Sequence, residues 1–103
     1  MATTTNVNAR IERSLHAILA ETEDLPDLLS EWDSLPDWNQ YSVKLDWAHL
    51  MADYLTELHE FARTGQMSAE QQARYQVLRR ALQAALPIIE RLNLYRPPVA
   101  LDA

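Results

Sequence analysis

The chain has 103 residues, of which 48% are apolar and 23% are charged, and its formal net charge at pH 7 is −6. Its single glycine cannot supply the glycine-rich turns of a phosphate-binding loop or a dinucleotide-binding fold. The absence of cysteine excludes thiol nucleophiles, iron–sulfur clusters, cysteine zinc sites and disulfides. A chain of this length predicts one domain, spanning residues 1–103.

The composition favours helix over strand. Leucine and alanine supply 30 residues, whereas valine, isoleucine and threonine supply 14. Helices tolerate the first group and strands prefer the second. We therefore predict an all-α fold, a small antiparallel bundle of three main helices in three to four segments, followed by an extended C-terminal tail.

The first predicted helix covers about residues 5–23. Its apolar side chains recur every three or four residues, which places them in one narrow stripe. Residues 3–6, three threonines and an asparagine, are candidate N-caps. The stripe consists of Val7, Ile11, Leu15, Ile18 and Thr22.

Two related motifs follow, Asp24–Leu28 and Ser34–Trp38, each with the form cap–Leu–Pro–Asp–apolar. Each predicts a helix start, because proline suits the first helical turn and aspartate at the third position completes a capping box. The segment between them is a predicted short helix at 25–33. Since its apolar side stays in phase with the preceding stripe, one long helix bent at Pro26 is the alternative.

The second main helix is predicted at about residues 43–63. Its apolar side chains occupy an arc of roughly 140° at 100° per residue. Gly65 suits a left-handed residue just past the helix end. The arc consists of Trp47, Leu50, Met51, Tyr54, Leu55, Leu58, Phe61 and Ala62.

A break is expected before this helix, near residues 39–42. If the helix continued backwards, Gln40 would point inward while Trp38 and Leu45 would point outward. The break avoids this arrangement, and Ser42 then becomes the candidate cap.

The last helix is predicted at residues 69–93, beginning with a capping box at Ser68–Gln71. Pro87 projects to the solvent side, and the apolar stripe resumes in phase after it. We therefore expect a helix that bends at Pro87 and continues to about residue 93. Residues 94–103 form the tail, in which Val99 and Leu101 can dock on a surface.

Charge is divided unevenly along the chain. Residues 21–60 contain eleven carboxylates against Lys44 alone, a net charge of −10, whereas residues 61–96 carry a net charge of +4. In one interpretation the two segments lie beside each other and partly neutralise, within a chain or across a dimer. In the other, the acidic segment binds a basic protein or the basic segment binds phosphates.

A carboxylate–histidine metal site is the one enzymatic alternative that the sequence offers. Asp46, His49 and Asp53 share a helix face, with a spacing found in di-iron bundles. They lie opposite the apolar arc, however, and the second Glu-x-x-His that such a site needs does not occur. We predict no catalytic residues, no metal site and no cofactor.

The strongest functional hint is a surplus of large apolar side chains around the irregular stretch between the helices. They do not all fit on the inward faces of three helices, and aromatic side chains are enriched at protein interfaces. The sequence therefore predicts a non-catalytic protein-interaction module, a homodimer or a small subunit of a larger assembly. The alternative is that the short helix buries these rings internally. The predicted partner-binding residues are Trp32, Trp38, Tyr41 and Leu45.

A second functional hypothesis is an accessory helical subunit of a nucleic-acid-binding complex. The sequence isoelectric point of about 4.9 argues against a stand-alone nucleic-acid-binding protein. The last helix nevertheless offers candidate phosphate contacts, namely Arg74, Arg79, Arg80 and Arg91.

The same sequence predicts a cytoplasmic protein without a membrane segment. Its longest apolar run, residues 84–89, is six residues long and includes Pro87. A membrane-spanning helix needs about 20. Residues 1–8 show neither the basic cluster nor the apolar core of a secretion signal.

Overall fold

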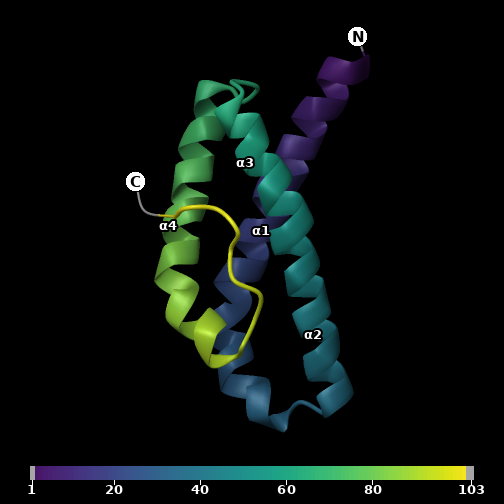
Figure 1. The fold of residues 1–103 in the computed structure, drawn as a ribbon, viewed down its shortest axis with the longest axis vertical. Helices are drawn as coiled ribbons and strands as arrows, with labels where there is room; N and C mark the ends of the chain where they lie inside the picture. Colours follow the sequence, from purple (N-terminus) through teal and green to yellow (C-terminus); the bar gives the residue numbers. More distant parts are fainter. Residues whose placement is uncertain (1, 102–103) are drawn as a thin grey trace.

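The computed structural model describes residues 2–101, where all regular structure is helical, which confirms the all-α class. Three rods run antiparallel in an up-down-up order, and the middle rod is one arm built from α2, η2 and α3 (Figure 1). No helix in this part of the chain has the length and apolar character to cross a membrane. The elements are α1 (Ala2–Glu31), a 3₁₀ turn η1 (Trp32–Ser34), α2 (Asp37–His49), a π-helical segment η2 (Leu50–Leu55), α3 (Thr56–Arg63) and α4 (Ala69–Arg91).

Helix α1 is continuous through Pro26, so the prediction of a separate short helix at 25–33 is wrong and the long-helix alternative holds. Asp24 and residues 3–6 lie inside the helix instead of capping it. A proline inside a helix costs about 3 kcal/mol. Burial of apolar side chains offsets this cost, because Leu25 is buried and Leu28 and Leu29 are half-buried against the core.

Helix α2 begins at Asp37, so the predicted break at 39–42 and the cap at Ser42 are also wrong. Pro36 occupies the N-cap position, and the Ser34 hydroxyl donates instead to the Glu31 carbonyl at the end of α1. The inward position of Gln40 is tolerated because its amide is satisfied. Gln40 Nε2 donates to the carbonyls of Trp32 (2.7 Å) and Leu35 (3.4 Å).

The π-helical segment η2 keeps the buried side chains of the arm in line. Trp47, Met51 and Leu55 are all buried, although side chains four apart drift by about 40° per step on an α-helix. A π turn contains more residues than an α turn, which reduces this drift. The arm contacts α1 through η2 and α3, where Met51, Leu55 and Leu58 are buried.

Helix α1 packs against both other rods, α4 and the arm. At 1.5 Å per residue its 30 residues extend about 45 Å, close to the 47 Å long axis of the molecule. The predicted stripe is confirmed, with Val7 half-buried and the other four residues buried. The core also contains Trp47, Met51, Leu55, Leu58, Met67, Tyr75, Leu78, Leu82, Ala85, Ile89, Leu92 and Leu94.

Left-handed residues end both α3 and α4. Gly65 has φ 76°, as predicted, and Asn93 has φ 57°. Each is followed by the pair of backbone bonds that defines a Schellman motif. Helix α4 thus ends at Arg91, two residues before the predicted boundary, and Pro87 is exposed inside it. The bonds run from Gln66 N–H to Phe61 O (3.0 Å), Gly65 N–H to Ala62 O (3.4 Å), Leu94 N–H to Ile89 O (2.9 Å) and Asn93 N–H to Glu90 O (3.1 Å).

The C-terminal tail docks on the bundle. It runs back across the face between α4 and α2 (Figure 1). Trp47 Nε1 donates to the Tyr95 carbonyl at 2.8 Å, and Arg79 Nη2 donates to the Ala100 carbonyl at 2.8 Å. Val99 and Leu101 pack half-buried against the core. Residues 102–103 of the predicted tail lie outside the described residues.

Replacing Gly65 with alanine should destabilise the fold by about 1 kcal/mol. A Cβ at this position meets no atom within 4 Å, so the loss comes from the left-handed backbone alone. Gly65→Asn, which tolerates this conformation better, should lose less. Urea unfolding followed by circular dichroism measures both, and an unchanged stability of Gly65→Ala contradicts the account.

Candidate interaction sites

Three of the four predicted partner-binding residues form one exposed stripe on α2. Trp38 is 73% exposed, Tyr41 65% and Leu45 52%. Their spacing of three and four residues places them on the same side of the helix. These three residues are called the α2 stripe below. The fold leaves this face of α2 in water, because the opposite face carries Gln40 and Trp47 toward the interior.

Trp32 is separated from the other three. It lies in η1, half-buried against the core, and its carbonyl accepts the bond from Gln40. Internal burial, the alternative considered for the whole group, thus applies to this ring alone.

The structure reveals a second surface, a groove of about 410 Å³ between the C-terminal half of α1 and α2, lined mostly by the acidic segment 21–60 that one interpretation assigns to a basic protein. These elements form the lower half of the bundle in Figure 1. Apolar side chains line part of it, namely Leu25, Leu28, Val43, Trp47 and Leu94. Its remaining lining residues are carboxylates: Glu21, Asp24, Asp27, Glu31 and Asp46. This surface is called the acidic groove below.

The spacing of the groove carboxylates on α1 can be recognised in the sequence. Residues 21, 24, 27 and 31 recur every three or four positions, which is one side of a helix. A first helix that ends at residue 23, as predicted, contains only the first of these four positions. Helix α1 has to continue past Pro26 before the four carboxylates line one wall.

The groove carboxylates are not neutralised by the chain. Of the ion pairs within residues 2–101, none involves any of the five. One pair, Glu60 with Arg63, joins the acidic segment 21–60 to the basic segment 61–96. Internal neutralisation of the two segments, one of the two interpretations of their charge, is thus limited to neighbours on α3.

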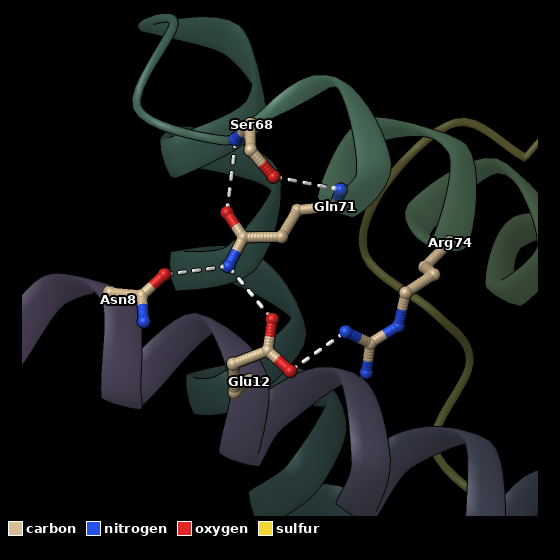
Figure 2. A network of polar contacts seen from close by, with 5 residues as sticks. All are labelled: Asn8, Glu12, Ser68, Gln71 and Arg74. Atoms are coloured by element: carbon tan, nitrogen blue, oxygen red, sulfur yellow. Dashed lines mark hydrogen bonds and ion pairs between the residues drawn. The ribbon is translucent and has the colours of Figure 1, made fainter.

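Arg74, a candidate phosphate contact, belongs to a polar network between α1 and α4 (Figure 2). Its Nη1 donates to Glu12 Oε1 at 2.7 Å. The buried Gln71 amide donates to Glu12 Oε2 at 2.8 Å and to Asn8 Oδ1 at 2.9 Å. Gln71 also completes the predicted capping box with Ser68. This network satisfies the buried amide, whose inward position the sequence analysis did not predict.

The other three candidate arginines differ in their surroundings. Arg79 holds the tail at Ala100, and its guanidinium lies 5.9 Å from the centre of the Tyr75 ring. Arg80 and Arg91 are exposed on α4. Half of the predicted phosphate contacts are therefore engaged in contacts that hold the fold.

The carboxylate–histidine triplet does not converge. His49 Nδ1 lies 2.7 Å from Asp53 Oδ2, and both side chains are 61% exposed, whereas Asp46 lines the acidic groove. Across residues 2–101 there is no group of three or more potential ligands placed to hold a metal ion.

His59, by contrast, is half-buried and hydrogen bonded to the Tyr75 hydroxyl at 2.7 Å. Burial raises the pKa of Tyr75 to about 12.

The structure thus offers two candidate surfaces, the α2 stripe and the acidic groove, and they lie on roughly opposite sides of α2, because Trp47 lines the groove. Comparison of the chain with protein-family models, with curated proteins and with solved structures gives no match. The two surfaces are therefore defined by the side chains of this chain alone.

The Glu12 network makes the stability of the bundle sensitive to acid. The hydrogen bond from Arg74, and next that from Gln71, lowers the pKa of Glu12 below its ordinary value of 4.5. A carboxyl whose pKa is lower in the folded state stabilises the fold above its unfolded pKa. That contribution is lost as the pH falls through the lowered value.

Glu12→Gln should therefore be less stable than the wild type at pH 7, and the difference should narrow below pH 4.5. Urea unfolding across this pH range measures the effect. Glu23→Gln, an exposed acid on the same helix, is the control and should follow the wild-type profile. A stability difference that stays constant with pH would mean that Glu12 acts through packing and not through its charge.

Proposed function

We propose that this protein is a non-catalytic helical interaction module that binds a protein partner through the α2 stripe, as a homodimer or as a small subunit of a larger assembly. The observation that supports this most is the exposure of Trp38, Tyr41 and Leu45 on a single helix face. Helices that dock through an apolar face use anchors at this spacing.

The energetics favour this use of the stripe. An aromatic side chain buries 150–250 Å² in an interface, and each Å² of apolar surface removed from water contributes about 25 cal/mol. Tryptophan and tyrosine are also the residues that most often dominate binding energy. Two aromatic side chains and the adjacent Leu45 provide the centre of an interface.

Charge favours the subunit form over a face-to-face homodimer. The stripe lies within the segment 21–60, which carries a net charge of −10. Pairing two α2 stripes would bring two copies of this segment together, and like charges across an interface oppose association. A partner with a cationic surface would instead approach faster and in a preferred orientation.

The nucleic-acid alternative has less support. Arg74 and Arg79 make contacts within the chain, which leaves Arg80 and Arg91 as the exposed members of the candidate set. Two arginines on a chain with a net charge of −6 give a weak phosphate-binding surface. Our proposal keeps the cytoplasmic location expected from the composition.

Trp38→Ala should weaken assembly by about 30-fold, the equivalent of about 2 kcal/mol at an interface centre. The fold should lose less than about 0.5 kcal/mol, since the ring is largely exposed. Light scattering after size-exclusion chromatography measures self-assembly. For a different partner, a protein captured by the wild type is purified and titrated against both forms.

Val77→Ala is the matched control, because Val77 is 51% exposed on α4, a different helix. It should assemble like the wild type. A Trp38→Ala variant that binds as tightly as Val77→Ala would exclude the α2 stripe as the contact surface.

A further inference from the structure

We propose that the acidic groove is a second binding site, which takes a basic amphipathic helix from a partner protein. Such a helix carries apolar side chains on one side and lysine or arginine on its flanks. This site is separate from the α2 stripe and does not depend on the function proposed above.

The apolar part of the groove is already in place without a partner. Leu25 and Trp47 are buried, so their positions are fixed by the core. The Trp47 ring is held by its bond to the Tyr95 carbonyl, and Leu94 by its backbone bond to Ile89. These side chains need no rearrangement and form a preformed base. The apolar surface that an entering side chain covers is that of the half-buried Leu28 and Val43.

The carboxylates determine which ligand complements this surface. Residues 21, 24, 27 and 31 on α1 span ten positions, or about 15 Å along the helix. Asp46 stands on the α2 wall. Lysine or arginine side chains on successive turns of a second helix have the same spacing, so several charge pairs form together.

The apolar side chains and the carboxylates of the groove together favour a peptide helix over other cations. A groove of about 410 Å³ has room for side chains but not for a whole helix, so the partner backbone lies across the opening. A small polyamine would pair with the acids but would leave the half-buried Leu28 and Val43 uncovered. Nucleic acid would be repelled by the same carboxylates.

The probe for the test is a fluorescein-labelled synthetic helix of leucine and lysine, with leucine on one side and lysine on the other. Fluorescence anisotropy measures its binding to the full chain. Asp27→Asn/Asp46→Asn removes one charge from each wall and should weaken binding about tenfold. Glu23→Gln/Asp33→Asn makes the same change in net charge at exposed positions outside the groove. This control should change binding less than about twofold.

Two further measurements test the apolar part. Val43→Lys places a cation on the half-buried side of the groove and should weaken binding at least as much as the double variant. A scrambled peptide of the same composition, without an apolar side, should bind at least about tenfold more weakly. Circular dichroism and urea unfolding verify that each variant is folded.

Several outcomes would overturn the proposal. Equal losses in the two double variants would mean attraction by net charge alone. A scrambled peptide or spermine that binds as well as the probe would mean that the apolar lining is not used. Self-association lost in Asp27→Asn/Asp46→Asn would assign the groove to a second copy of the chain.

Trp38→Ala separates this proposal from the previous one. It should leave binding of the synthetic helix unchanged, because Trp38 does not line the groove. If Trp38→Ala abolishes binding and the groove variants do not, the peptide occupies the α2 stripe. That result would overturn the groove proposal and leave the proposed function standing.

Discussion

The apolar stripe of α1 is the contact on which the rest of the structure depends. Helix α1 packs on α4 along one side and on the arm along the other, so both rods share it as a partner. Burial of each large apolar side chain stabilises the fold by about 1.5–3 kcal/mol. A chain of this size buries only about two thirds of its unfolded surface, which leaves little redundancy if α1 is displaced. Continuity of α1 past Pro26 also builds one wall of the acidic groove.

Polar contacts specify how the rods are aligned along this apolar seam. A buried amide costs free energy unless its donors and acceptor are paired, so Gln71 holds α4 opposite Asn8 and Glu12 of α1 (Figure 2). Gln40 plays the same part at the other end of the bundle, where it joins α2 to the carbonyls of the connecting turn. Hydrophobic burial is non-directional, so by itself it does not specify how the rods are aligned. The directional hydrogen bonds of these two glutamines specify that alignment.

The features that were predicted correctly depend on interactions between residues that are close together in the sequence. The α1 stripe, the capping box at Ser68 and the left-handed turn at Gly65 depend on residues within one or two turns of each other. The errors arose where tertiary contacts outweigh local preference. A cap contributes about 1 kcal/mol, less than the burial of leucines beyond Pro26. The carbonyls that satisfy Gln40 are in place only after the turn before α2 has formed.

Of the two candidate surfaces, the α2 stripe could be predicted from local sequence and the acidic groove could not. Exposure of the α2 stripe followed from helical projection, since Trp38 and Leu45 point outward whenever Gln40 points inward. The predicted break at 39–42 is wrong because the chain adopts this arrangement, with the Gln40 amide satisfied by the carbonyls of Trp32 and Leu35. The acidic groove needed the pairing of α1 with α2 and the position of Leu94 after α4, which no short stretch of sequence encodes.

Both surfaces reduce the stability or solubility of the isolated chain, which supports the proposal that they bind partners. Like charges three or four residues apart on a helix destabilise it by about 0.2–0.5 kcal/mol per pair, and residues 21, 24, 27 and 31 make three such pairs. The exposed rings of Trp38 and Tyr41 favour aggregation over solubility. A partner that covers the stripe and pairs with the carboxylates removes both penalties, and departures from locally favourable chemistry are expected at functional surfaces.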